Sequence, residues 1–222
     1  MGQEYTRSLT TLGLLPISGS VLFYDNFECL LHFTRFGTSG DYIFELDPSI
    51  AFSGSQSLNT KTRTTGTAPG DNINASLLSH LSPAKILTHT VRLLSPDFTK
   101  IDVLQIMHHF YDGTDINTAS IYFYPNTPVW KYLDSSNAEQ SIANSGFNLF
   151  NDGWHLLTLK INYLTGKYLS LTIDDVIFDL STYAIYINTN PTLRHLDSQC
   201  YFKTIGAAPA QLRLDEFSLT EH

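Results

Sequence analysis

The sequence predicts an all-β protein, an antiparallel jelly-roll β-sandwich of about a dozen strands preceded by an extended N-terminal arm. Short apolar or alternating runs repeat along the chain, and Gly, Pro, Asn, Asp and Ser cluster between them. No window keeps a helical period for about 12 residues, and the best one, residues 74–85, is interrupted by Pro83. Aromatic residues make up 13% of the chain and charged residues 15%, which excludes a disordered chain and a coiled coil.

The expected strands are runs of five to ten residues bounded by turn residues. In chain order they are Val21–Phe27, Tyr42–Leu46, Ser57–Thr64, Ile86–Leu94, Asp102–Tyr111, Thr118–Tyr124, Val129–Leu133, Trp154–Tyr163, Tyr168–Ile173, Val176–Leu180, Gln199–Ile205 and Leu212–Leu219. Residues 1–20 form the arm, and residues 21–222 are expected to form one sandwich domain. A chain of 222 residues buries about 70% of its unfolded surface and needs no disulfide or metal to fold.

The clearest local pattern is a three-stranded meander over Trp154–Leu180. Leu157, Leu159 and Ile161 alternate with polar residues, and Gly166 suits the tight turn that follows. The return strand is expected to bury one set of alternate side chains and expose the other. The buried set is Leu169, Leu171 and Ile173, and the exposed set is Tyr168, Ser170 and Thr172.

Charge and hydropathy limit the compartment and the partners. The chain has 13 Lys and Arg against 21 Asp and Glu, a formal charge of −8 without a basic run, which argues against nucleic-acid binding. No stretch approaches the roughly 18 apolar residues of a membrane span, and residues 1–20 lack the pattern of a secretory signal. We expect cytoplasmic synthesis, with incorporation into a virion or an extracellular assembly. Cys29 and Cys200 are either two buried thiols or one bridge between neighbouring terminal strands.

Four segments resemble the concanavalin A-like lectin/glucanase superfamily, the jelly roll of lectins, laminin-G-type modules and many glycosidases. Phe23–Glu28 resembles its opening strand, Ala51–Leu58 the segment that follows, Trp154–Asp175 its Trp-led hairpin, and Leu214–Phe217 its closing strand. The resemblance covers nearly all of the chain from residue 21 onward. It implies the sandwich architecture, and also a structural calcium held between the first and last strands. The matching carboxylates are Asp25, Glu28 and Asp215.

The residues argue against an enzyme. The glucanases of this superfamily place their paired carboxylates on one strand, about 5 Å apart. The nearest segment here, Glu45–Ile50, keeps the first pair, lacks the second Glu and contains Pro48. His108 and His109 are adjacent and point to opposite faces of a strand, so they cannot chelate one metal. Residues 112–117 are interpreted as a solvated turn. We therefore predict no catalytic residues, and a glycosidase is the least favoured alternative.

A segment rich in aromatic residues, 122–132, is the candidate glycan-binding surface. Tyrosine and tryptophan rings stack on the CH faces of sugars, and amides bind hydroxyl groups. Tyr122, Tyr124 and Trp130 are expected to face out of the sheet while Phe123 faces inward, although alternate aromatic residues also fill sandwich cores. The candidate residues are Tyr122, Tyr124, Asn126, Trp130 and Tyr132.

The arm favours an assembly role. Its apolar residues are too few and too interrupted to form a core, and such clusters often mark a contact surface. They are Leu9, Leu12, Leu14, Leu15 and Ile17. The arm docks either on another protein subunit, in a homo-oligomer or larger assembly, or back on its own sandwich. The first functional hypothesis is therefore a non-enzymatic structural subunit, such as a virion or decoration protein, and the alternative is a lectin-like module that binds a glycan.

Overall fold

The structure is a computed structural model, and it describes residues 20–28, 32–37, 42–63, 67–79, 86–146 and 148–222. Almost every regular element in these residues is a β-strand, and one short 3₁₀ turn, Phe98–Lys100, precedes a long strand. The all-β fold class is confirmed. In the part of the chain that the structure describes, no helix has the length and hydropathy of a membrane span. Residues 1–19 and Cys29, and with them the arm residues and one of the two thiols, lie outside the described residues.

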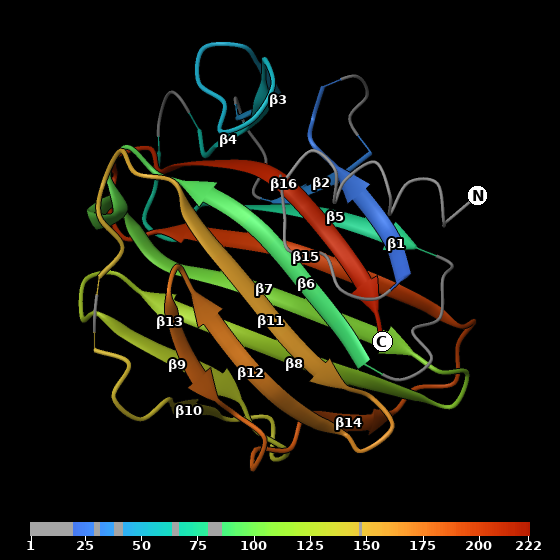
Figure 1. The fold of residues 1–222 in the computed structure, drawn as a ribbon. Helices are drawn as coiled ribbons and strands as arrows, with labels where there is room; N and C mark the ends of the chain where they lie inside the picture. The colour runs from blue at the N-terminus through green and yellow to red at the C-terminus, as the bar shows by residue number, and fades with distance from the viewer. Residues whose placement is uncertain (1–19, 29–31, 38–41, 64–66, 80–85, 147) are drawn as a thin grey trace.

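Two antiparallel sheets form the sandwich, and Figure 1 shows them as two layers. Sheet A has the order β13 (Val176–Asp179), β12 (Lys167–Ile173), β11 (His155–Asn162), β6 (Ile86–Leu94), β16 (Gln211–Glu221), β4 (Ser57–Lys61) and β3 (Ile43–Asp47), and β1 (Ser20–Asp25) also pairs with β16.

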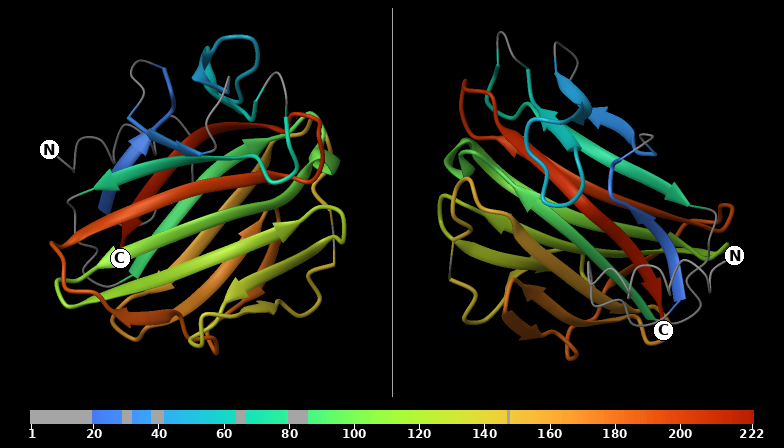
Figure 2. Two further views of the ribbon diagram at one scale, coloured as in Figure 1. Left: turned by 180° about the vertical axis from the view of Figure 1, so that it is seen from behind. Right: turned by 45° about the horizontal axis from the view of Figure 1, so that its top comes forward.

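Sheet B forms the other layer, which faces the viewer in the left panel of Figure 2. Its order is β10 (Glu139–Ser141), β9 (Val129–Leu133), β8 (Asp115–Tyr124), β7 (Ile101–Tyr111), β15 (His195–Thr204), β5 (Asn72–Ser79) and β2 (Thr34–Gly37), and β14 (Tyr186–Thr189) also pairs with β8.

The twelve strands expected from the sequence all overlap strands of the structure, and the bounds of Ile86–Leu94 and Val129–Leu133 are the same in both. Four further strands, β2, β5, β10 and β14, were not expected. The most consequential of them is β5, because it lies inside sheet B between β15 and β2.

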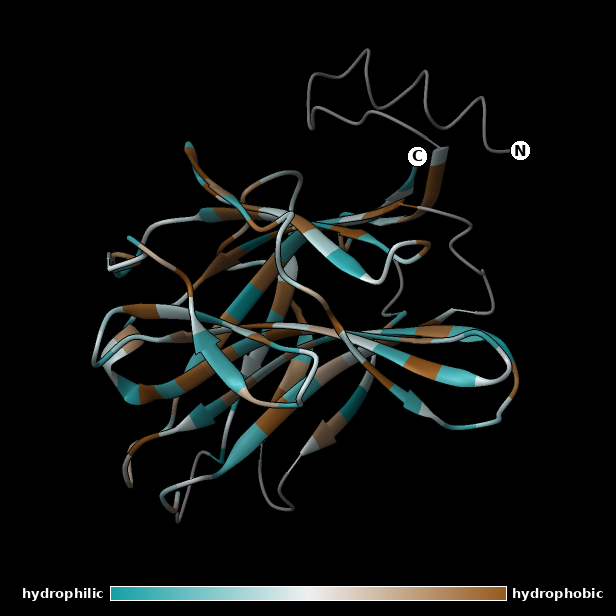
Figure 3. Cartoon of the chain, turned by 90° about the horizontal axis from the view of Figure 1, so that it is seen from below, coloured by the Kyte–Doolittle hydropathy of each residue, from teal (hydrophilic) through white to brown (hydrophobic). Residues whose placement is uncertain are grey.

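Alternation along the strands places the hydrophobic core between the two sheets. In β7, Ile106, His108 and Phe110 are buried, whereas the residues between them are partly exposed. Hydrophobic and hydrophilic segments alternate in the same way along many strands in Figure 3. The buried side chains of both sheets therefore meet in one layer, and the alternate side chains form two outer faces.

The face assignment of the meander was right for Leu171 and wrong for Tyr168. A register irregularity between Lys160 and Ile161 pairs Ile161 with Tyr168, so that Tyr168 points inward and is fully buried. Its hydroxyl receives the backbone N–H of Ser120 at 2.9 Å and lies 2.9 Å from the carbonyl oxygen of Leu133, both in sheet B. The irregularity thus gives sheet A a polar anchor on the opposite sheet.

Candidate functional site

The outer face of sheet B is the candidate site, because polar and aromatic side chains gather there across its central strands. Each side chain on this face alternates with a buried neighbour on its own strand, as Gln105 alternates with Leu104 and Ile106. The outer face of sheet B includes Phe36 of β2, Asn74 and Ser76 of β5, Asp197, Gln199, Tyr201 and Lys203 of β15, Gln105, Met107, His109 and Tyr111 of β7, Thr118, Ser120, Tyr122 and Tyr124 of β8, and Lys131 of β9.

Hydrogen bonds between side chains hold the polar groups of this face in place. Asp197 Oδ1 accepts a hydrogen bond from the Ser76 hydroxyl at 2.6 Å, and the amide of Gln199 donates to the other carboxylate oxygen. Gln199 in turn accepts from the amide of Asn74. Ser76 and Gln199 therefore hold the carboxylate directly, and Asn74 is fixed through Gln199, before any ligand binds, which lowers the ordering cost of binding.

Histidine and tyrosine rings occupy one end of the face. Tyr111 and His195 stack with ring centroids 4.1 Å apart, and His109 Nδ1 lies 3.0 Å from the Thr118 hydroxyl. Burial lowers the pKa of His109, and the carboxylate of Asp197 opposes part of that shift. His109 is therefore neutral at pH 7, with a ring nitrogen able to donate or accept one hydrogen bond.

The lysines of this face are paired with carboxylates. Lys203 Nζ lies 2.6 Å from the Asp102 carboxylate, and Lys131 Nζ lies 3.1 Å from that of Glu139. The same Glu139 oxygen accepts from the Tyr124 hydroxyl at 2.7 Å. Because Asp197 adds a carboxylate held by neutral donors, the described part of this face carries no excess of positive charge.

Two of the five residues expected to bind a glycan lie on this face, and two others belong to the core. Tyr122 and Tyr124 face outward and Phe123 inward, as expected. Trp130 is wrong as a stacking platform, because it pairs in register with Phe123, stacks on that ring at 4.5 Å and is 1% exposed. Tyr132 points inward in the same way and stacks on Tyr183 at 4.3 Å.

Asn126, the fifth residue, lies in the turn between β8 and β9. Its amide donates to the carbonyl oxygen of Ile101 at 3.0 Å, which ties this turn to the start of β7. The structure therefore does not bring Asn126, Trp130 and Tyr132 together with the two outward tyrosines as one binding surface.

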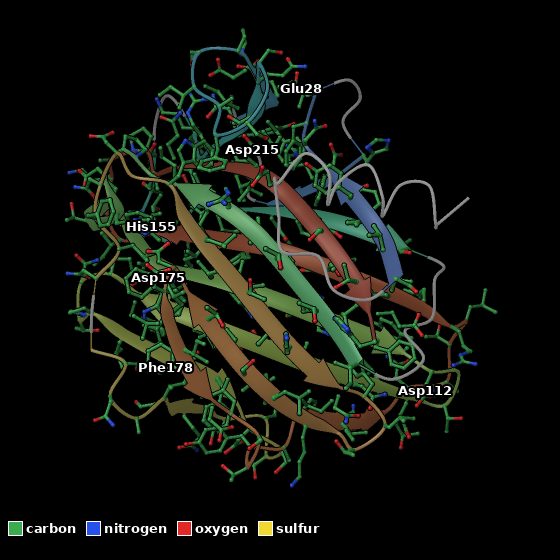
Figure 4. The ribbon with its side chains drawn as sticks, in the orientation of Figure 1. Glu28, Asp112, His155, Asp175, Phe178 and Asp215 are labelled. Carbon is green, nitrogen blue, oxygen red and sulfur yellow. The ribbon has the colours of Figure 1, made fainter. Side chains whose placement is uncertain are left out.

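The three carboxylates expected to hold calcium each have donors from the protein. Asp215 Oδ2 accepts the backbone N–H groups of Phe52 and Ser53, and Glu28 accepts those of Ser55 and Gln56. Glu28 and Asp215 thus bind the same loop at one end of the sandwich, where Figure 4 shows them. Asp25 turns elsewhere, with one oxygen on the N–H of Phe27 and the other 2.7 Å from His32 Nδ1.

Burial and hydrogen bonds shift these carboxyl groups in opposite directions. Burial raises the pKa of Asp215 to about 6, whereas the hydrogen bonds from Ser55 lower the pKa of Glu28. Among the described residues, no group of three or more His, Cys, Asp and Glu side chains is placed to hold a metal ion. The side chains as placed therefore do not form the expected ligand set, and calcium binding by this chain stays a prediction.

The other sequence candidates have structural partners. Asp47, on the edge strand β3, lies 2.7 Å from the Arg213 guanidinium. Asp112 closes the turn between β7 and β8, at a place well separated from Glu28 in Figure 4, by accepting the N–H groups of Thr114 and Asp115. His108 is buried on the inner face of β7, opposite in direction to His109. In the described residues these groups stabilise turns, edges and core.

Sequence reasoning missed the part of the site that lies on β5 and β15. In Asn72–Ser79, asparagine and serine alternate with Ile73, Ala75 and Leu77, and in Gln199–Lys203 polar and aromatic residues alternate with Cys200 and Phe202. That alternation was the available signal. The strand β5 was missed because asparagine and serine are also typical of turns.

Comparisons with known proteins support the fold. No protein-family model and no curated protein matches the sequence. Among solved structures, "Cellulose induced protein, Cip1" is similar with a TM-score of 0.64 and 11% identity over 90% of this chain and 97% of that one.

Two further solved structures are similar at comparably low sequence identity. The carbohydrate recognition domain of Emp46p in its potassium-bound form has a TM-score of 0.54 and 10% identity, over 94% of each chain. The carbohydrate esterase vb_24B_21 from the Shiga toxin-encoding bacteriophage phi24B has a TM-score of 0.54 and 12% identity, over 86% of this chain and 90% of that one. These likenesses confirm the jelly-roll β-sandwich fold.

Proposed function

We propose that this protein is a concanavalin A-like glycan-binding module that binds carbohydrate on the outer face of sheet B. The observation that carries the proposal is the composition of that face, where tyrosines lie beside fixed amide, hydroxyl and carboxylate groups. The corresponding face of sheet A instead presents a ladder of hydroxyls, with Thr158 paired in register to Thr90 and to Thr172.

The chemistry of the face suits a sugar ring. A pyranose presents CH groups on its two faces and hydroxyls at its rim, so it needs an aromatic surface with polar groups beside it. Tyr122 and Tyr201 supply partly exposed rings, and Asn74 and Gln105 supply amides on neighbouring strands. Because the amides are already hydrogen-bonded to Gln199 and Ser120, little side-chain freedom is lost on binding.

Two of the similar solved structures support the proposed glycan-binding function by analogy of fold. One similar structure is the carbohydrate recognition domain of Emp46p, and another is a phage protein named a carbohydrate esterase. A shared fold hosts many functions, so the proposal depends on the composition of the site itself. We infer a non-catalytic role, because Asp47, one of the two candidate carboxylates, lies on the edge strand β3 and forms a salt bridge with Arg213. No reducing ends should be released from glycans that the protein binds.

A glycan array with paired variants tests the proposal. The wild-type protein should bind at least one class of glycan, and Tyr122→Ala/Tyr201→Ala should abolish that binding without unfolding. Thr158→Ala/Thr172→Ala, on the outer face of sheet A, is the matched control and should bind as the wild type does. Loss of binding in the control variant alone would contradict the proposal, because it would place the glycan site on sheet A.

The assembly role stays a prediction beside this one. It depends on the arm, residues 1–20, of which residues 1–19 lie outside the described part of the chain. Deleting residues 2–19 and measuring particle size by light scattering tests it. The glycan-binding alternative has the stronger support, since both the composition of the outer face of sheet B and the neighbours' names agree with it.

A further inference from the structure

A row of side chains crosses sheet B at right angles to its strands, and aromatic and amide residues alternate along it. Strand register pairs Tyr122 with Gln105, Gln105 with Tyr201, Tyr201 with Asn74, and Asn74 with Phe36. We call these five residues the cross-strand row. It joins β8, β7, β15, β5 and β2, and all five side chains lie on the outer face of the sheet.

The aromatic residues of the row recur on every second strand. Neighbouring strands lie about 4.8 Å apart, so rings on every second strand are separated by about 9.6 Å, roughly the length of a disaccharide. In a β-1,4-linked chain successive pyranoses are turned over, and every second residue presents the same face. A chain lying along the row would therefore place equivalent rings over Tyr122, Tyr201 and Phe36.

The two amide residues of the row lie where the intervening sugars of such a chain would be. Gln105 lies between Tyr122 and Tyr201, where its amide donates to the Ser120 hydroxyl at 2.8 Å. Asn74 lies between Tyr201 and Phe36 and is held by Gln199. Each amide is thus held in place between two aromatic residues of the row, where an intervening sugar would lie.

Access and charge limit the class of chain. Phe36 is 58% exposed on the edge strand β2, so one end of the row is open to solvent. Lys131 lies next to Tyr122 at the other end, and it is paired with Glu139. The five residues of the row carry no positive charge, and the neighbouring Lys131 is already paired, so an acidic polysaccharide would find no free counter-charge along the row.

The twist of the sheet favours a single polysaccharide chain over a crystalline polysaccharide surface as the ligand. Adjacent strands rotate by roughly 20° to 25°, so the row turns by roughly 80° to 100° over its four steps. A flat crystal face cannot contact all three rings at once, whereas a single chain can follow the turn.

We propose that the cross-strand row binds a single, soluble, neutral polysaccharide chain with β-1,4 linkages, running across the strands with alternate sugars on Tyr122, Tyr201 and Phe36. This inference rests on the proposed glycan-binding function and adds the class of chain and its direction.

Isothermal titration with β-1,4-linked oligosaccharides of increasing length tests the row. The row spans four strand spacings, about 19 Å, so affinity for neutral oligosaccharides should rise up to about five sugar units and then level off. Tyr201→Ala should lower that affinity roughly tenfold or more, and Tyr201→Phe should retain it. Phe36→Ala should remove the gain from trimer to pentamer, and it keeps the test open if Tyr201→Ala fails to fold. Phe150→Ala is the control, because Phe150 is 64% exposed and lies outside sheet B.

The outcomes separate this inference from the function on which it rests. Glycan binding that survives both Tyr201→Ala and Phe36→Ala would overturn the row and leave the glycan-binding function standing. Preference for alginate or polygalacturonate over neutral chains, or for crystalline cellulose over soluble oligosaccharides, would overturn the proposed class. Failure to bind any glycan would overturn the function and the row together.

Discussion

Trp130 and Phe36 show how the direction of one side chain decides whether an aromatic residue serves the core or the surface. The sequence around Trp130 favours a binding platform, because tyrosines, an asparagine and prolines surround it. Register decides otherwise, since pairing with Phe123 turns Trp130 inward. Phe36 carries no such sequence signal, yet its pairing with Asn74 places it on the outer face of sheet B.

Substitution of these two residues should give opposite results. Trp130→Ala should lower the free energy of unfolding by about 3–5 kcal/mol, because it removes a buried ring that stacks on Phe123. Phe36→Ala should change it by about 0.5 kcal/mol or less, as expected at an exposed edge. Denaturant unfolding followed by fluorescence or circular dichroism measures both. Equal losses would contradict the face assignment of β9 and β2.

At the scale of the element, strands whose inner positions form a clear apolar pattern were predictable, whereas the short strands β2, β10 and β14 and the asparagine- and serine-rich strand β5 were not. Ile86–Leu94 was expected with its observed bounds, because β-branched residues and leucines fill seven of its nine positions. The strand β5 was missed because asparagine and serine occupy its outer positions. The same residues make β5 part of the candidate site, so in this strand the features that serve the surface also weaken the sequence signal for a strand.

The strand β12 offers a test of element-level patterning. Leu171 is 1% exposed and faces the core, while Thr172 pairs across the outer face with Thr158 and Ile177. Leu171→Ala should therefore cost about 2–5 kcal/mol of unfolding free energy, and Thr172→Ala about 1 kcal/mol or less. Urea melts of the two variants compare them. A larger loss in Thr172→Ala would mean that the strand buries its other face.

At the scale of the whole molecule, fold class and strand order along the chain were accessible from sequence, whereas contacts between the sheets were not. The pairing of strands far apart in the sequence depends on register, which a one-residue irregularity changes, as at Tyr168. A second contact between the sheets joins two histidines. His89 Nδ1 of β6 lies 2.8 Å from His108 Nε2 of β7, and His108 Nδ1 lies 2.9 Å from the Ser198 hydroxyl.

This buried contact should make the sandwich sensitive to acid. Burial lowers the pKa of His108 from 6.5 to about 3, and burial together with the neighbouring His108 lowers that of His89. Below pH 6.5 the unfolded chain binds protons that the folded one does not, so stability falls as pH falls towards 3. Each such histidine contributes up to about 1.36 kcal/mol per pH unit in this window. Asp215 acts in the opposite sense, because its pKa is raised to about 6.

The contribution of His108 can be isolated by comparing variants across pH. His108→Gln removes one proton-binding site from both states, so the slope of unfolding free energy between pH 6.5 and about 4 should become shallower by up to about 1.36 kcal/mol per pH unit. Asp215 is present in wild type and variant alike, and its effect cancels in the comparison. Ser198→Ala is the control, because it removes the hydroxyl beside His108 without removing a proton-binding site, and it should lower stability by a similar amount at every pH. An unchanged slope in His108→Gln, measured by urea unfolding at each pH, would show that the histidine contact between the sheets does not set the acid limit of this fold.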